Sequence, residues 1–354
     1  MRMGLFITRR LASRILLVVT VFFGLIFLSE MLNTGRFVRL SENVNTMTAF
    51  LVPIYAAAHW SIKGLPVTVL IGGIAALLDL QSHRELLVIK ASGVSVWRLL
   101  ILPITALVAA GFLVTLLLDG PVTAANRVYN PTPNMSSAGS LAGGEVWLDQ
   151  QSEGIRYVMH GQRDGDAARL RQVTIYLFAA ENDVQIEAKR ATLRNGHWII
   201  ENARRLTGTG PGETYPRMIL ATDSSPAEIV LKLGPMEDFT LSELTRALGQ
   251  GIADPRTRAG AQTRFARLMS MPFLLVGSLL IAFAFTAGYR RTGTYGAMIL
   301  YGIILGFVVF VITEMAERAG SAGVLDPAFA AWGPVVVSIV IGVTVLLRKE
   351  DGRA

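Results

Sequence analysis

The chain has 354 residues, of which 52% are hydrophobic and only 17% charged, and its mean hydropathy is +0.47. This composition excludes a single soluble domain of ordinary make-up. The sequence has no cysteine, which excludes disulfide frameworks, thiolate metal sites and thioether-linked haem. In a soluble protein the formal net charge of +7 would suggest nucleic-acid binding, but here the cations flank apolar segments, and we expect no nucleic-acid partner.

Several apolar windows are long enough to cross a hydrocarbon core about 30 Å thick, which takes roughly 20 residues per helix. These windows are 15–33, 99–118, 268–289, 294–313 and 328–347, with a sixth at 49–79 that Lys63 interrupts. The first follows an arginine-rich start but lacks a small-residue cleavage site, so we interpret it as a retained span and not a signal peptide. The sequence therefore predicts a polytopic α-helical membrane protein with six transmembrane helices.

Positive side chains in short loops predict the orientation. Six spans put both termini on one side, and the short segments on that side carry twelve Lys and Arg residues. The short loops on the opposite side hold only Arg36, Arg39 and Arg318. We therefore expect the N- and C-termini to be cytoplasmic and the long segment after the third span to lie outside.

That long segment alternates apolar and polar side chains as β-strands do. The alternating positions are Val146/Leu148, Ile155/Tyr157/Met159, Val173/Ile175/Leu177, Val184/Ile186/Ala188, Ala191/Leu193, Trp198/Ile200 and Met218/Leu220. Seven or eight short strands predict a β-sandwich or jelly roll. Thr240 and Glu243 have the spacing of a capping box, which predicts a short helix ending near Leu248.

Three regions follow from this pattern. Residues 1–118 should hold the first three spans, 119–260 the outer β domain with its short helix and linker, and 261–354 the last three spans. A membrane-anchored structural or scaffolding protein that acts through its β domain would also have this organisation.

We find no motif for catalysis. Gly288 and Gly293 have the spacing of a phosphate-binding loop, but Thr294 stands where that loop needs a lysine. No His-Glu-x-x-His zinc motif is present, and Ser278 has no His or Lys in a neighbouring span to activate it as the nucleophile of an intramembrane hydrolase. We therefore expect no catalytic residue, metal or cofactor in this chain.

The loop between the second and third spans carries the most specific signal. Ser82 is a suitable N-cap with Glu85 at the capping-box position, and Gly93 is a natural stop, which predicts a helix over 82–93. Its apolar side chains cover most of the circumference, more than one membrane-facing stripe needs. The helix either contacts a second protein or lies at the membrane interface, and its physical properties favour neither.

The string from Arg84 to Ser95, with Trp97-Arg98, resembles the signature of the LptF/LptG permeases of bacterial lipopolysaccharide export, as do Leu65-Pro66 and Leu70-Ile-Gly72. Features near the C-terminus resemble the LptG branch more than the LptF branch, which is the alternative. They are Tyr301-Gly302, Gly306-Phe307, Leu325-Asp-Pro327, Ala330-Ala-Trp332, Pro334 and Glu350-Asp-Gly352.

The resemblance implies the transmembrane subunit of an ATP-driven ABC transporter in the bacterial inner membrane. Such a subunit extracts lipopolysaccharide from the outer leaflet and passes it to a periplasmic bridge. The implied partners are a second LptF/LptG-type permease, a cytoplasmic LptB-type ATPase dimer and LptC/LptA-type bridge proteins. The implied ATPase-coupling residues are Arg84, Glu85, Leu86, Leu87, Ala91, Ser92 and Gly93, of which Glu85 would enter the ATPase groove.

Lipopolysaccharide carries phosphates, so the permease should place cations near the outer membrane boundary. The candidates are Lys63, His59, Arg36, Arg39, Arg264 and Arg267. On a straight helix measured from Asp79, Lys63 lies about 24 Å and His59 about 30 Å towards the outside. The alternative is that each side chain merely extends to water from a helix end.

A Gly302-x-x-x-Gly306 pair in the fifth span predicts close helix packing. The resemblance implies that the first and fifth spans line lateral gates. The alternative is tight packing within this chain.

Overall fold

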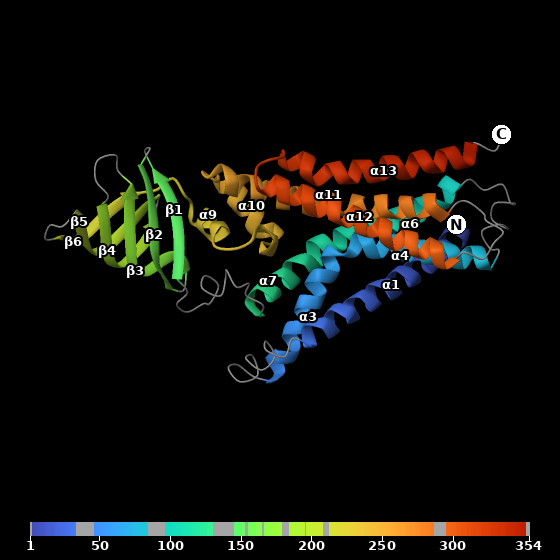
Figure 1. The fold of residues 1–354 in the computed structure, drawn as a ribbon, viewed down its shortest axis with the longest axis horizontal. Coiled ribbons are helices and arrows are strands. Elements are labelled where there is room, and N and C mark those ends of the chain that lie inside the picture. The colour runs from blue at the N-terminus through green and yellow to red at the C-terminus, as the bar shows by residue number, and fades with distance from the viewer. Residues whose placement is uncertain are drawn as a thin grey trace. The chain divides into compact units, whose positions relative to one another are not determined.

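In the computed structural model the chain forms two compact units, residues 1–125 with 263–354, and residues 126–262. Figure 1 shows helices in the first unit and a sheet in the second. The predicted 84–93 segment, Arg36 and Arg39 lie outside the described residues. Those described are 2–32, 46–83, 96–129, 145–152, 155–164, 166–178, 184–194, 196–207, 212–286 and 295–351.

The first unit is helical, and two of its helices, α7 and α11, continue into the second unit. Its elements are α1 (Arg2–Met31), α3 (Thr46–Lys63), α4 (Leu65–Ser82), α6 (Val96–Leu113), the π-helical turn η1 (Val114–Leu118), α7 (Asp119–Tyr129), α11 (Pro255–Thr286), α12 (Tyr295–Ser321) and α13 (Pro327–Asp351).

Five stretches of helix in the described part of the chain are long and apolar enough to cross a membrane. They are Gly4–Met31, Leu65–Ser82, Trp97–Arg127, Pro255–Thr286 and Pro327–Arg348. The expected helical polytopic architecture with an inserted β domain is therefore confirmed, while the number of six spans stays a prediction.

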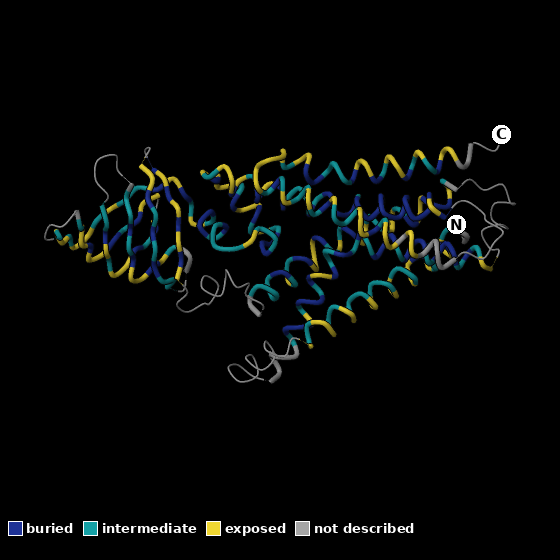
Figure 2. Tube along the Cα trace, in the orientation of Figure 1, coloured by how far each residue is buried: buried dark blue, intermediate teal, exposed yellow. Residues whose placement is uncertain are grey.

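Helix α11 lies at the centre of the helical unit and α1 at its outside. In the most apolar 18 residues of each helix, 83% are buried in α11 but only 6% in α1. Figure 2 shows the resulting contrast between the two helices. The outer face of α1 exposes large apolar side chains such as Leu17, Val21 and Leu25. Such a surface suits contact with lipid or another apolar surface rather than water.

The apolar window 49–79 forms two helices that meet at Gly64, and not one span interrupted only by Lys63. Helix α3 ends at Lys63, and α4 has a proline in its first turn. Proline is favoured there because the first backbone N–H groups of a helix have no partner within the helix. Figure 1 shows the change of direction between α3 and α4. The straight-helix depths for Lys63 and His59 therefore do not apply.

In the part of the second unit that the structure describes, six strands form one antiparallel sheet in the order β1-β2-β3-β4-β5-β6. Its elements are β1 (Glu145–Ser152), β2 (Ile155–Asp164), β3 (Asp166–Phe178), β4 (Val184–Arg194), β5 (His197–Thr207), β6 (Glu213–Ala221), α9 (Pro226–Lys232), the 3-10 turn η2 (Met236–Asp238) and α10 (Leu241–Gln250).

The described residues of this unit form six strands in chain order, where seven or eight short strands of a sandwich or jelly roll were predicted. The alternating segments at 184–188 and 191–193 are one continuous strand, since Arg190 keeps its pairing with Glu201 of β5 between them. The expected alternation itself is confirmed, because every second residue of β1 is buried. The strands of the sheet are therefore longer than the short strands that the alternation suggested.

The buried face of the sheet forms the core of the β domain. Trp198, Tyr157, Met159, Ile175 and Ile200 are each at most 1% exposed. Along β2, β3 and β5 these buried side chains alternate with less buried ones, as in a sheet with one face turned to the core. The apolar side of α9 contributes further buried side chains to this core.

At one end of the sheet, the last residue of β6 bonds β2 and the segment after β6 bonds β1; we call these contacts the closure of the sheet. The Tyr157 hydroxyl donates to the Ala221 carbonyl at 2.8 Å, and the Thr222 hydroxyl donates to Gln150 Oε1 at 2.5 Å. The Asp223 N–H donates to the Gln151 carbonyl at 3.2 Å. Burial raises the pKa of Tyr157 to about 12, so its hydroxyl remains a neutral donor at physiological pH.

The predicted helix after Thr240 is confirmed as α10, with both hydrogen bonds of the capping box present. Arg127 of α7 donates to the same Glu243 at 2.7 Å and lies 5.6 Å from the Phe239 ring centre. Burial alone would raise the pKa of Glu243, but hydrogen bonds from Arg127 and the Thr240 backbone outweigh burial and lower it. A capping box therefore also fastens the end of α7.

Removing one hydroxyl tests the closure of the sheet. We expect Tyr157→Phe to destabilise the β domain by about 1–2 kcal/mol, because the partly buried Ala221 carbonyl loses its donor. Hydrogen–deuterium exchange of the purified protein should become faster in peptides that cover 150–152 and 221–224. Tyr215→Phe is the matched control, since that hydroxyl bonds the exposed Glu213. Equal exchange in both variants would contradict the closure.

Candidate functional site

Two ion pairs join three helices inside the helical unit. Arg264 of α11 lies 3.4 Å from the Asp119 carboxylate of α7, and Arg267 of α11 lies 3.6 Å from Glu317 of α12. The four side chains are between 5% and 13% exposed. The π-helical turn η1 ends directly before Asp119, and such turns often accompany functional positions in helices. We call these four residues the charged cluster.

The charged cluster has polar atoms beyond its ion pairs. Buried atoms without a hydrogen-bond partner among the described residues include Asp119 Oδ2, Arg264 Nε, Arg267 NH1 and the hydroxyls of Thr123 and Thr263. Native proteins usually satisfy such atoms with protein groups, water or a bound group. The charged cluster can therefore form further hydrogen bonds.

Arg264 and Arg267 were expected to offer free positive charge to phosphate where the fourth span begins. The structure places both inside the bundle, and each has a carboxylate partner. Burying a charge requires such a partner, because the apolar interior solvates ions poorly. The sequence shows that acidic residues are present in the neighbouring spans but not which of them face these arginines.

Lys63 and His59 lie on the same helix, with Trp60 between them in contact with both. The Lys63 ammonium lies 4.9 Å from the Trp60 ring centre, a cation–π distance. His59 is buried and packs edge-on against the same ring. Trp60 is 49% exposed and was not among the predicted site residues. A tryptophan beside a lysine at a helix end is a recognised interfacial signal that could have identified it.

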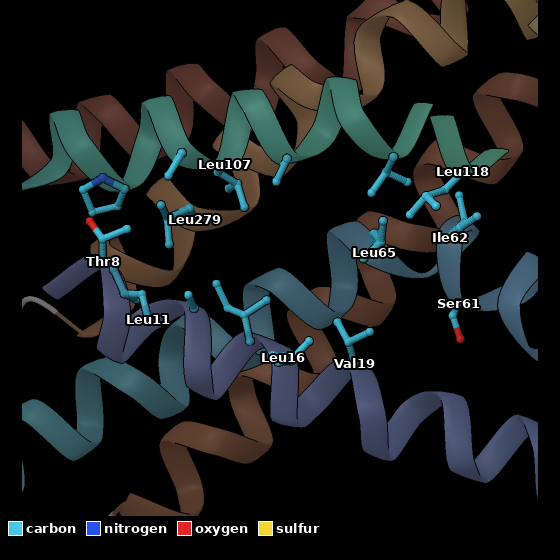
Figure 3. A pocket seen from close by; sticks show the side chains of 16 residues that line it. Thr8, Leu11, Leu16, Val19, Ser61, Ile62, Leu65, Leu107, Leu118 and Leu279 are labelled. Carbon is cyan, nitrogen blue, oxygen red and sulfur yellow. The ribbon is translucent and has the colours of Figure 1, made fainter. Parts of the chain in front are cut away.

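An apolar cavity of about 430 Å³ lies between α1, α3, α4 and α6. Figure 3 shows Leu11, Leu16 and Val19 of α1 on one side of the cavity and Leu107 of α6 on another. Ser61 is the lining residue whose buried hydroxyl has no hydrogen-bond partner within the described ranges. The cavity is lined by hydrocarbon and suits an aliphatic chain.

The cavity and Lys63 share a stretch of backbone. Ile62 and Leu65, which flank Lys63 in the chain, both line the cavity. Lys63, with its aromatic neighbour Trp60, is therefore flanked along the chain by residues that line the apolar cavity. This order of chemical groups matches an amphiphile that has an anionic head and an aliphatic tail.

At the predicted inner end of the bundle, Asp79 of α4 pairs with two arginines of α1. Its carboxylate lies 2.9 Å from Arg14 and 3.1 Å from Arg10. Ser82 is the last residue of α4, and its hydroxyl donates to the Asp79 carbonyl. The helix predicted to start there continues outside the described ranges, so its N-cap stays a prediction.

The predicted coupling residues follow this helix end and lie outside the described ranges. They are Arg84, Glu85, Leu86, Leu87, Ala91, Ser92 and Gly93. Their roles stay predictions.

Gly302 and Gly306 belong to α12. A methyl group at Gly306 would lie 3.1 Å from Leu70 and 3.2 Å from Val67, both in α4. This contact supports the alternative that Gly306 serves close packing within the chain.

The comparisons with known proteins cover nearly the whole chain. The model of the family described as "Lipopolysaccharide export system permease LptF/LptG" matches residues 5–348. The lipopolysaccharide export system permease protein LptG of Haemophilus influenzae is 24% identical over 306 residues. The matched region covers 81% of this chain and 82% of that relative.

Separating the charges of one buried pair tests the charged cluster. We expect Asp119→Ala to destabilise the purified protein by about 3–5 kcal/mol, because Arg264 would remain buried without a counter-charge. The double variant Asp119→Leu with Arg264→Met should regain most of that loss. Thermal unfolding in detergent measures both effects.

The matched control for this experiment is Asp149→Ala, which breaks an exposed pair with Arg156. Exposed pairs contribute at most about 1 kcal/mol, so this variant should unfold close to the wild-type temperature. If Asp119→Ala also unfolds there, the buried pair is not a structural requirement.

Proposed function

Because the chain belongs to the LptF/LptG family of lipopolysaccharide export permeases, we propose that it is the LptG-branch transmembrane subunit of an ATP-driven transporter. It would extract lipopolysaccharide from the outer leaflet of the inner membrane and pass it to a periplasmic bridge. The observation that carries this proposal is the family match over residues 5–348, which spans both the helical unit and the β domain.

The LptF branch of the same complex is the alternative. The Haemophilus influenzae relative and the sequence features near the C-terminus favour LptG. A second permease of the other branch would then complete the pair.

ATP hydrolysis belongs to a separate subunit in this proposal. Members of the family are permease subunits and not enzymes, and the sequence lacks a phosphate-binding loop. An LptB-type ATPase dimer would supply the energy, and LptC/LptA-type proteins would receive the lipopolysaccharide.

We place six spans in the inner membrane, with α3 and α4 together counted as one and with both termini in the cytoplasm. The β domain would then lie in the periplasm. Residues 1–118, 119–260 and 261–354 would be the three regions of the chain. The distribution of Lys and Arg in the short loops supports this orientation.

Lys63 would contact a phosphate of lipopolysaccharide, with an acyl chain in the adjacent apolar cavity. The cation, the half-exposed Trp60 and the hydrocarbon lining support this assignment. Arg36 and Arg39 would add positive charge around the head group, and His59 would contribute through its contact with Trp60. The place of the two arginines in the loop after the first span and the packing of His59 on Trp60 support this assignment.

Arg264 and Arg267 would take part in substrate binding only by leaving Asp119 and Glu317. Their burial therefore favours a role in holding α7, α11 and α12 together.

Glu85 offers the direct test of the proposed function. We expect Glu85→Ala to reduce ATP-dependent release of lipopolysaccharide from proteoliposomes by about tenfold or more, because the ATPase would lose its contact with the permease. The measurement uses the co-expressed complex of both permeases and the ATPase. Glu145→Ala, an exposed change in the β domain, is the control and should release as wild type does.

The same preparation can also give results that contradict the proposed function. A chain that co-purifies with neither a second permease nor an ATPase would act as a scaffold instead. Wild-type release without ATP would also overturn the proposal.

Lys63 offers a test of the substrate site. We expect Lys63→Ala to weaken lipopolysaccharide binding by about tenfold, which is the loss of one charge-assisted hydrogen bond of roughly 1.5 kcal/mol. A photocrosslinking amino acid at Trp60 should capture lipopolysaccharide in the wild-type background. The same amino acid at Leu347, near the predicted inner end of α13, is the control. Equal capture at both positions would refute the site.

A further inference from the structure

We propose that Asp79 is a positioning residue that transmits movement of the segment after α4 to α1, and through α1 to the apolar cavity. This inference rests on the proposed function, because it assumes that an ATPase moves the 84–93 segment. It adds a path from that segment to the predicted substrate site. The argument starts from the electrostatics of the helix end.

Asp79 lies in the last turn of α4, where a carboxylate is unfavourable. The helix dipole places partial negative charge at that end, so an unpaired aspartate there costs free energy. Arg14 donates to Oδ1 at 2.9 Å, and Arg10 Nε lies 3.1 Å from Oδ2, an ion-pair contact without hydrogen-bond geometry. The Asp79 side chain is only 16% exposed. Two cations on one carboxylate therefore fasten this helix end to α1.

Close packing holds the same two helices together above this ion pair. A methyl group at Gly72 of α4 would lie 2.7 Å from the Ile15 Cα of α1. A methyl group at Gly64 would lie 2.6 Å from the Phe22 ring. From Asp79 to Gly64 these contacts extend over about 22 Å of helix. Close-packed elements move as bodies, so α1 and α4 should shift together.

The end of α4 is also tied to α11. Gln81 donates through its side-chain amide to the Thr286 carbonyl at the last residue of α11. Helix α11 is packed on most sides, whereas the outer face of α1 contacts no other described helix along most of its length. Movement of the helix end therefore displaces α1 more easily than α11.

Helix α1 forms one wall of the apolar cavity. Thr8, Leu11, Leu16 and Val19 line the cavity from α1. A rigid displacement of α1 therefore changes the width of the cavity. The ion pair at Asp79 joins α1 to the last turn of α4, which directly precedes the segment that the ATPase would move.

The experiment measures lipopolysaccharide released per ATP hydrolysed by the reconstituted complex of both permeases and the ATPase. We expect Asp79→Asn to lower this ratio by about fivefold or more, with ATP hydrolysis retained. Asp79→Glu should keep most of the wild-type ratio. A merely structural role would reduce the yield of complex and leave the ratio of the assembled complex unchanged.

Arg14 of α1, the partner of Asp79, can be tested with a matched control on the same helix. Arg14→Gln should reproduce the loss seen with Asp79→Asn. Arg9→Gln removes the same charge from an exposed position of α1 and should keep the wild-type ratio.

A distance measurement keeps the inference testable if the Asp79 variants do not assemble. The chain has no cysteine, so Ser13→Cys and Ser82→Cys place one spin label on α1 and one at the end of α4 without further changes. The distance between the labels should stay constant when the complex moves from the ATP-free to the vanadate-trapped state. A change in that distance in an otherwise wild-type complex overturns the inference, since α1 would not follow α4.

The outcomes separate the inference from the function on which it rests. If wild type releases lipopolysaccharide with ATP and Asp79→Asn keeps the same ratio, the inference fails and the proposed function stands. If wild type releases none, or Glu85→Ala has no effect, the proposed function fails and the inference fails with it.

Discussion

A charge inside a helix bundle needs an opposite charge beside it, because the interior solvates ions poorly. This requirement explains the polar contacts of the helical unit at both ends of the spans. Asp119 with Arg264 and Arg267 with Glu317 join three helices at one end. Asp79 with two arginines joins α1 and α4 at the other. Apolar contacts fill the space between, and the ion pairs add charged contacts between particular helices.

The charged side chains of the helical unit differ in their surroundings. The buried pairs of the charged cluster hold helices together and are costly to separate, which makes them poor ligands for a passing phosphate. Lys63 lies beside the half-exposed Trp60 and next along the chain to residues that line the apolar cavity, and its charge also acts on Asp119 of the charged cluster. Asp79 precedes the segment that the proposed function assigns to ATPase contact. These charges therefore differ in their surroundings: those of the charged cluster are buried in ion pairs, and Lys63 lies beside an aromatic ring.

The β domain depends on a different constraint, which is the pairing of every buried backbone group. Its strands follow one another in the sheet, so each strand pairs with its neighbour in sequence. The closure at one end is not local, since residues after the last strand bond the first. The alternation of side chains located the strands, but it divided β4 into two segments. Alternation shows which residues face the core and gives no information on where one strand ends.

Features that depend on residues close together along the chain could be predicted from the sequence. Hydrophobic length predicted the spans, period-two alternation predicted the inward positions of the strands, and the Thr240–Glu243 spacing predicted α10 with its cap. The residues from Arg84 to Ser95 pointed to the family before any comparison. Three features could not be predicted from the sequence. Arg264 faces Asp119, the chain bends at Gly64, and α4 ends at Ser82. These depend on which helices pack together, and packing brings together residues that are distant along the chain.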